Sequence, residues 1–392
     1  MSVDLSVEIA GVRFKNPLIV AAGTPTLSAK HIIRCFKAGA AGAVTKTITY
    51  DKMHRLQPKP RMFVLKPHEV LRGGFYSFYS IELMSELDPK TWVNEIRRVK
   101  KEFPDNILIA SIAGRTLEEW EKLARLVDEA GADMVELNLS CPHVERNEMM
   151  GKAAARRLDI VKSVIKVVKD SVGIPVIGKL SPQGANPLDL ARTMASVGVD
   201  AVVSTARFQG LVIDIESMKP ILWGGFGGYG GPWQVPISVA WTAHIAMEIP
   251  DVPIIGSGGI SCGEDAIQFI LAGATAIQVC TAVIVRTHRI IRTILEGLSE
   301  WMHRKGFSQV SEFRGLALGR IKPLEKLERR KIFAIRVDRD KCTKCAMCAR
   351  ICPYDAISIK EEGIVINDDR CDNCGLCVAL CPQKALSMIR RS

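Results

Sequence analysis

The chain has 392 residues, of which 47% are hydrophobic and 24% are charged, and its formal net charge is +11. These fractions are typical of folded proteins, and the length suits a large domain with a small one, or two ordinary domains. The positive charge is dispersed and no basic run is interleaved with aromatic residues, so we expect no nucleic acid partner. Residues 1–10 do not resemble an export signal and no segment is apolar enough to span a membrane, so we expect a cytoplasmic protein.

Short β-branched runs alternate with helical stretches between residues 17 and 315. Several helical stretches end in Ala-Gly-Ala or a close variant, where glycine suits a left-handed helix C-cap before the next strand. The alternation predicts an α/β fold, a (β/α)8 TIM barrel over residues 1–315, with a doubly wound parallel sheet as the alternative. The expected strands cover residues 18–22, 43–47, 107–111, 134–139, 175–180, 201–205, 253–256 and 276–280.

Polar residues and glycines follow most of these strands, and a barrel would bring them to one rim, where active sites of this fold lie. Two long connections, residues 50–89 and 208–239, would build or cover a pocket there. The second contains a glycine tract that either is flexible or lets backbone approach a ligand. The residues expected at the rim are Lys46, Asn138, Ser140, Cys141, Lys179, Arg207, Gly258, Gly259, Thr281 and Ala282.

The loops after the last two expected strands predict a phosphate site. Gly258 and Gly259 follow the seventh strand, and Thr281 and Ala282 follow the eighth. In this fold these two loops recurrently bind phosphate through backbone N–H groups, which requires glycine for access.

Two lysines, Lys46 and Lys179, end otherwise apolar strands. A buried lysine is costly unless it faces an anion or a polar ligand, and a reduced flavin is such a ligand. The alternative is that both side chains extend outward to solvent. Cys141 lies just beyond the fourth strand, and we interpret it as a general acid/base, because removing a hydride from one carbon requires removing a proton from its neighbour.

Two cysteine runs near the C-terminus each read C-x2-C-x2-C-x3-C-P. This spacing is that of bacterial 4Fe-4S ferredoxins, in which the fourth cysteine of each run ligates the other cluster. Zinc and a disulfide framework are the alternatives, but they suit paired C-x2-C motifs and small secreted domains, respectively. We therefore predict a ferredoxin domain over residues 335–392, after a basic linker at 316–334, with ligands Cys342, Cys345, Cys348 and Cys381 for one cluster and Cys371, Cys374, Cys377 and Cys352 for the other.

The sequence resembles the dihydroorotate dehydrogenase superfamily of FMN-binding barrels, through residues 138–142 (Asn-Leu-Ser-Cys-Pro), Thr45-Lys46-Thr47, Lys179 and Gly258-Gly259. Residues 22–26, 81–83, 103–107 and 278–280, and the order of barrel then ferredoxin, are most similar to the pyrimidine-reducing half of dihydropyrimidine dehydrogenases and the bacterial subunit built from it. The resemblance implies FMN contacts from Ala22, Gly23, Lys46, Asn138, Lys179, Gly231, Gly258, Gly259, Thr281 and Ala282. It also implies that Cys141 is the acid/base, and that electrons pass between FMN and the clusters.

The sequence departs from this family where the substrate is held. Ser80 stands in place of an asparagine two residues before Glu82, and Ala206-Arg207 stands in place of an Asn-Thr pair. Losing amide partners for a pyrimidine ring would cost about 1 to 3 kcal/mol each, whereas Arg207 suits a carboxylate or phosphate. We therefore expect a related, anionic substrate held by Ser80, Glu82, Asn138, Ser140 and Arg207.

Three functions remain open on the sequence. The first is an FMN and iron-sulfur oxidoreductase that acts on a C–C bond of a dihydropyrimidine-like compound. The second is a dihydroorotate dehydrogenase of pyrimidine biosynthesis, and the third is an electron-transfer subunit without a substrate. No Gly-x-Gly-x-x-Gly turn lies between an early strand and a helix, where a dinucleotide site would need it. We therefore expect a separate NAD(P)H-oxidising flavoprotein or a soluble ferredoxin as partner, and a homo- or hetero-oligomer.

Overall fold

A computed structural model describes residues 3–141, 143–144, 149–361 and 363–391. The chain forms two compact units, residues 1–321 and 322–392. The linker bounds of 316 and 334 stay a prediction. No helix in the described part of the chain is long and apolar enough to cross a membrane.

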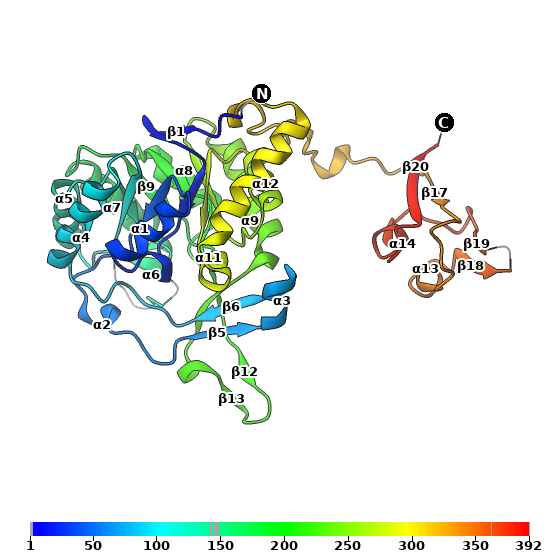
Figure 1. Ribbon diagram of the computed structural model, residues 1–392, viewed down its shortest axis with the longest axis horizontal. Helices are drawn as coiled ribbons and strands as arrows, with labels where there is room; N and C mark the ends of the chain where they lie inside the picture. The colour runs from blue at the N-terminus through cyan, green and yellow to red at the C-terminus, as the bar shows by residue number, and fades with distance from the viewer. Residues whose placement is uncertain (1–2, 142, 145–148, 362, 392) are drawn as a thin grey trace. The chain divides into compact units, whose positions relative to one another are not determined.

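The first unit is built on a closed barrel of eight parallel strands (Figure 1). Each predicted strand overlaps one of them, so the barrel is confirmed and the doubly wound sheet is excluded. In chain order the strands are β3 (Leu18–Val20), β4 (Gly42–Val44), β7 (Ile107–Ile112), β8 (Met134–Leu137), β9 (Val176–Lys179), β10 (Ala201–Val203), β15 (Ile254–Ser257) and β16 (Ala276–Val279).

Helices surround the barrel, and the strands alternate between two apolar cores. Leu18 and Val20 of β3 face the helix layer, whereas Ile19 between them faces the barrel interior, which is closed at the amino end by Phe14 of β2 (Val12–Phe14) after β1 (Val7–Ile9). The main helices are α1 (Ala29–Lys37), α4 (Pro89–Glu102), α5 (Leu117–Glu129), α7 (Leu158–Lys169), α8 (Pro187–Ser196), α9 (Val235–Glu248), α10 (Gly263–Leu271) and α12 (Arg289–Lys305).

Local sequence explains where these helices begin and end. The side chains of Asp88 and Thr116 accept backbone hydrogen bonds at the starts of α4 and α5. The glycines predicted after four helices all have positive φ, as the turn into the next strand requires: Gly39 (110°), Gly131 (94°), Gly198 (76°) and Gly273 (104°).

The two long connections pair with each other at the carboxyl end of the barrel. They supply a four-stranded antiparallel sheet in the order β11 (Phe208–Gly210), β14 (Gly227–Gly230), β6 (Ser77–Ser80) and β5 (Met62–Leu65). The glycine tract is thus an inner strand of a sheet, not a flexible loop. The hairpin of β12 (Ile213–Asp214) and β13 (Lys219–Pro220) projects from this sheet (Figure 1). The same end carries short helices: η1 (Thr24–Thr26), α2 (Lys52–Arg55), α3 (Pro67–Arg72), α6 (Gly151–Ala155), η2 (Leu222–Gly224), η3 (Pro232–Gln234) and α11 (Thr281–Arg286).

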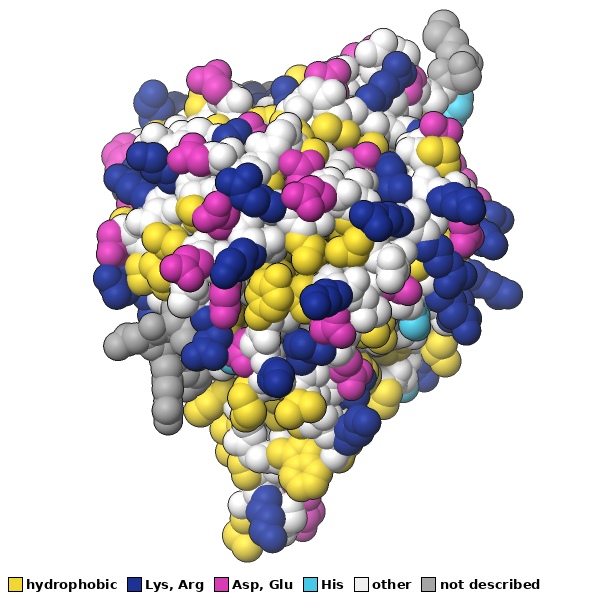
Figure 2. Space-filling model, turned by 90° about the vertical axis from the view of Figure 1, so that its left-hand side faces the viewer, with side chains coloured by type: hydrophobic (Ala, Val, Ile, Leu, Met, Phe, Trp, Pro, Cys, Tyr) yellow, Lys and Arg dark blue, Asp and Glu magenta, His cyan; other side chains and the backbone are white. Residues whose placement is uncertain are grey.

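The second unit is a small α+β fold. Strand β17 (Phe333–Val337) pairs with β20 (Leu386–Arg390), and β18 (Ile357–Lys360) pairs with β19 (Gly363–Ile366). Two short helices, α13 (Met347–Arg350) and α14 (Leu376–Ala379), follow the first two cysteines of each run and contain the third. The face of the molecule in Figure 2 shows basic and acidic side chains interspersed, which agrees with the dispersed charge expected from the sequence.

Candidate active site

A cavity opens at the carboxyl ends of the barrel strands, where the sequence predicts the functional residues. Its walls come from β8, β9 and β15, from residues that follow β3, β4, β8, β10 and β16, and from the first long connection. Ser80 does not line the cavity but contacts Arg207, which does. The other predicted residues that do not line it are Gly231, Gly258, Gly259 and Ala282. The predicted residues that line the cavity are Ala22, Gly23, Lys46, Glu82, Asn138, Ser140, Cys141, Lys179, Arg207 and Thr281.

Lys46 lies in the cavity wall against a buried carboxylate. Its Nζ is 2.9 Å from Oε1 of Glu82, and the hydroxyl of Thr24 donates to the same oxygen at 2.8 Å. Burial alone would raise the pKa of Glu82, but Lys46 and Arg207 overcome this effect and hold the pKa below its usual value. Glu82 is therefore ionised, and Lys46 is held inside the cavity by an ion pair.

Lys179 is held by a second buried network. Its Nζ donates to Oε1 of Gln278 at 2.8 Å and lies 3.3 Å from Oε1 of Glu136. The amide of Gln278 donates in turn to Oε2 of Glu136 at 2.6 Å, which closes the triangle. All three side chains are buried, so the ammonium has a fixed position in the wall.

Cys141 follows an ordered polar turn at the end of β8. Asn138 donates to the hydroxyl of Thr47 at 2.9 Å and accepts from the backbone N–H of Ser140 at 3.2 Å. The Cys141 side chain is buried, and burial raises the pKa of its thiol, so the group is protonated near neutral pH. Pro142, the last residue of the predicted motif, lies outside the described residues.

His143 does not activate this thiol as a charged partner. Burial is the main cause that lowers the pKa of His143 to about 3, and Arg207 and Lys46 add to it. A neutral imidazole cannot stabilise a neighbouring thiolate, as a nucleophilic cysteine requires. The arrangement at Cys141 suits proton transfer rather than covalent catalysis.

Arg207 crosses the added sheet to reach the cavity. Its Nη1 donates to the hydroxyl of Ser80 at 2.5 Å, and the register of the sheet places Gly228 opposite Ser80. A Cβ atom at Gly228 would lie 2.5 Å from Cζ of Arg207, so the guanidinium packs over bare backbone. Ser80 and Arg207, the two departures from the family pattern, are thus partners.

The predicted phosphate loop is tightly packed. Gly258 and Gly259 have φ values of 107° and 87°, and a Cβ at Gly259 would lie 2.7 Å from the carbonyl oxygen of Gly231. The hydroxyl of Ser238 is buried there without a hydrogen-bond partner among the described residues. Thr281, at the start of α11, lines the adjoining cavity.

The eight predicted cysteine ligands form two separate groups in the second unit. Each group lines its own small cavity and combines three cysteines of one run with the fourth of the other. We name them the first site (Cys342, Cys345, Cys348 and Cys381) and the second site (Cys352, Cys371, Cys374 and Cys377).

Comparison with known proteins identifies the family. The dihydroorotate dehydrogenase family model matches residues 4–302, and a 4Fe-4S dicluster domain model matches residues 324–385. The chain belongs to the dihydroorotate dehydrogenase family. It is 32% identical over 359 residues to the NAD-dependent dihydropyrimidine dehydrogenase subunit PreA of Escherichia coli K12, covering 90% of this chain and 86% of that protein.

Other members of the dihydroorotate dehydrogenase family are similar over the barrel alone. The chain is 37% identical over 317 residues to the catalytic subunits of dihydroorotate dehydrogenase B (NAD(+)) from Pyrococcus abyssi and Thermococcus kodakarensis. Each match covers 80% of this chain, and 99% and 98% of the relatives. The protein is therefore a flavin-dependent oxidoreductase that acts on CH–CH groups and carries a 4Fe-4S ferredoxin domain.

The geometry fits the FMN that the family implies. Lys46 and Lys179 present fixed cations to the cavity, and the unpartnered Ser238 hydroxyl lies beside the loop predicted to take the phosphate. The two cysteine sites fit 4Fe-4S clusters, because each offers four thiols in a largely apolar setting.

Several site residues were not predicted from the sequence. Glu136 and Gln278 accept hydrogen bonds from Lys179. Thr24 donates a hydrogen bond to Glu82, and Thr47 accepts one from Asn138. Glu136 and Gln278 each stand in a strand of otherwise apolar residues, and this buried polar character was the available signal.

Proposed function

We propose that this chain transfers hydride between FMN and a C–C bond of an anionic, dihydropyrimidine-like substrate. The observation that carries the proposal is the position of Cys141, which lines one cavity with Lys46, Asn138 and Lys179. Bound FMN would accept or give the hydride and divide its electron pair into single electrons. Lys46, Asn138 and Lys179 would hold the isoalloxazine ring, with Ala22 and Gly23 beside it.

Cys141 would move the proton. In substrate oxidation, the hydride leaves one carbon with its electron pair, and Sγ of Cys141 takes the proton from the adjacent carbon. In reduction the thiol returns that proton. A protonated thiol in a buried site is the form that reduction requires. The loop of Gly258 and Gly259, with Gly231, Thr281 and Ala282, would hold the FMN phosphate.

Charge balance in the cavity supports an anionic substrate. Among the described lining residues, Lys46 pairs with Glu82 and Lys179 pairs with Glu136. Among the described residues, the printed hydrogen bond of Arg207 goes to the neutral hydroxyl of Ser80, so these described lining side chains carry one more positive charge than negative charges to bind a ligand. A carboxylate on the substrate would accept its remaining N–H groups, while Asn138 and Ser140 would hold the ring.

We further propose two 4Fe-4S clusters, one in each cysteine site, through which electrons reach a partner. The sequence has no Gly-x-Gly-x-x-Gly turn between an early strand and a helix, and the names of the PreA and dihydroorotate dehydrogenase B relatives describe them as subunits. A separate NAD(P)H-oxidising flavoprotein would therefore complete the enzyme. The ferredoxin part favours the dihydropyrimidine reaction over dihydroorotate oxidation, because the dihydroorotate dehydrogenase B relatives match only the barrel.

An anaerobic assay of substrate-driven flavin bleaching tests the proposal. Purified protein would be mixed with dihydrouracil-type compounds, dihydroorotate and anionic cyclic amides. The active compound should bleach the flavin at least about 100-fold more slowly in Cys141→Ala, with flavin content unchanged. Cys262→Ala is the matched control, because Cys262 lies at the start of α10 outside the cavity. Equal bleaching rates in Cys141→Ala and the unaltered protein would overturn the acid/base role of Cys141, and bleaching by none of the compounds would favour an electron-transfer subunit.

A further inference from the structure

The second unit is an internal repeat whose two halves can be compared position by position. Residues 342–357 align with 371–386, and all four cysteines of each run coincide. The backbone repeats as well: Lys344 and Asn373 have φ values of 54° and 59°, and Asp355 and Lys384 have 49° and 50°. Differences between aligned residues therefore report real differences between the two sites.

The aligned residues differ chiefly in charge. Lys344 and Arg350 follow cysteines of the first site, and Lys384 follows its fourth cysteine. The aligned residues at the second site are neutral or acidic. In order from the first site to the second, the pairs are Thr343 and Asp372, Lys344 and Asn373, Arg350 and Ala379, and Lys384 and Asp355.

Contacts keep the basic charges at the first site. The guanidinium of Arg350 donates to the carbonyl oxygen of Cys345 at 2.8 Å, and Nζ of Lys344 donates to the carbonyl oxygen of Glu361 at 2.8 Å. These acceptors are uncharged backbone groups, so these two contacts do not neutralise the cations. Lys341 differs, because it forms an ion pair with Asp338 at 2.9 Å.

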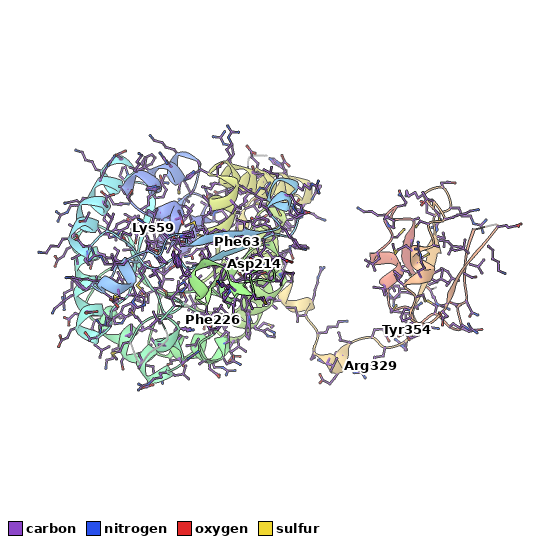
Figure 3. All side chains as sticks on the ribbon, turned by 90° about the horizontal axis from the view of Figure 1, so that it is seen from below. Lys59, Phe63, Asp214, Phe226, Arg329 and Tyr354 are labelled. Atoms are coloured by element: carbon purple, nitrogen blue, oxygen red, sulfur yellow. The ribbon has the colours of Figure 1, made fainter. Side chains whose placement is uncertain are left out.

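The second site keeps its acidic charges. Asp355 and Asp372 are exposed, and both stand within three residues of cysteines of that site. Tyr354, which lines the second site and is labelled in Figure 3, interacts with the side chain of Asp372. Both carboxylates therefore belong to the surroundings of the second site.

We propose that the first site has the higher reduction potential and is the docking end for a one-electron redox protein with an acidic face. The proposal rests on the proposed function, since it requires a cluster in each site. An added electron makes a cluster more negative, so nearby cations stabilise the reduced form and nearby carboxylates destabilise it. A single electron shared between the sites should therefore reside mostly at the first.

The surface of the first site suits that partner. Lys344, Arg350 and Lys384 are exposed, as is Cys345, and Met347 beside them is 40% exposed. Basic groups around an apolar side chain over a redox centre would steer an acidic protein and give it a contact for electron transfer. One electron would leave the first site, and the oxidised centre of the partner would gain it.

A charge-transfer variant of the full chain tests the order of potentials. The triple variant Lys344→Asn, Arg350→Ala, Lys384→Asp installs at the first site the residues of the second, in backbone conformations that those residues already adopt. Potentiometric titration followed by EPR should give two potentials in the unaltered protein. In the variant the upper one should fall by about 59 mV, a tenfold change for a one-electron couple, while the lower one stays.

The matched control is Lys322→Asn, Arg329→Ala, Lys326→Asp, which makes the same changes in the basic segment before the sites (Arg329 in Figure 3). It should shift neither potential. Stopped-flow oxidation by the anionic oxidant cobalt(III)-EDTA should slow about tenfold in the first variant at low salt, and oxidation by the cationic hexaammineruthenium(III) should not.

Iron content separates this proposal from the proposed function. About eight iron atoms per chain with two titrating clusters supports the function, and an unshifted upper potential in the triple variant would then overturn the proposed order alone. Slowing of cobalt(III)-EDTA oxidation by the control variant instead would assign docking to the basic segment and overturn the docking proposal. About four iron atoms per chain would overturn both proposals.

Discussion

Proton transfer at Cys141 depends on a thiol whose pKa is raised by burial. The neighbouring Lys46 and Arg207 favour the thiolate, but their effect is smaller than that of burial. The two directions of the reaction therefore need opposite protonation states, and the resting enzyme holds the state that reduction uses. Cys141 must lose its proton before substrate oxidation, whereas it is already protonated for substrate reduction.

The pH dependence of the two half-reactions should therefore be opposite. Substrate oxidation needs the thiolate, so its rate should rise with pH up to an apparent pKa above the ordinary thiol value of about 8.5. Substrate reduction needs the thiol, so its rate should be constant at low pH and fall as pH rises through the same pKa. Single-turnover flavin spectra at different pH values measure both profiles. An apparent pKa below 8 in the oxidation profile would contradict this assignment.

The Gln278→Leu variant tests the network that holds Lys179. The substitution removes the 2.8 Å acceptor of Lys179 and the 2.6 Å donor to Glu136, and leaves both charges buried with fewer partners. The free energy of unfolding should fall by about 1 to 3 kcal/mol, and FMN should bind more weakly. Gln268→Leu, on the exposed side of α10, should change the stability by less than about 0.5 kcal/mol. If both variants lost the same free energy of unfolding, the network around Lys179 would not stabilise the protein.

At the scale of elements, the sheet made by the two long connections positions the substrate side of the cavity. Ser80 ends β6, Gly228 lies in β14, and Arg207 precedes β11, so three neighbouring strands place one guanidinium. The position of Arg207 depends on glycine at 228, because an added Cβ would displace it. A substitution in the sheet can therefore alter specificity without touching the flavin side.

Gly228→Ala should lower the preference for anionic over neutral substrates. Losing a hydrogen-bonded charge contact corresponds to about tenfold or more in the ratio of kcat/KM values. Turnover of a neutral substrate should be little changed. Gly173→Ala is the control, because no heavy atom lies within 4 Å of the added Cβ. If Gly228→Ala and Arg207→Met both leave the ratio unaltered, the cation does not recognise the substrate.

The barrel could be predicted from the sequence because each strand and each C-cap glycine is a local signal. Lys179 ends β9, and Lys46 and Cys141 follow β4 and β8 by a few residues, so topology alone brings them to one rim. Ser80 and Arg207 form a hydrogen bond although they are 127 positions apart in the sequence. The sheet that brings them together could not be predicted from any local sequence pattern. The glycine tract lacks the alternation and β-branching of a strand, and it forms one because flanking strands supply its partners.

At the scale of the whole molecule, the two units differ in what stabilises them. The first has an extensive apolar core, whereas the apolar cluster described in the second is small and is built on four buried residues, Cys348, Ile357, Cys377 and Leu386. Two of these are predicted iron ligands. A unit of this size with so small a core depends on its metal for folding.

Iron removal should therefore unfold the second unit and leave the first intact. Anaerobic treatment with a strong iron chelator should open residues 322–392 to protease, while a fragment near 1–321 persists with its flavin. Mass spectrometry of the digest and the visible flavin spectrum measure the two effects, and a mock-treated sample is the control. The reason is that cysteines gathered around two cavities lose the bonds that bring them together, whereas the barrel strands keep their hydrogen bonds and both apolar cores. Protease resistance throughout 322–392 after complete iron loss would mean that β17–β20 pairing alone is enough to fold the unit.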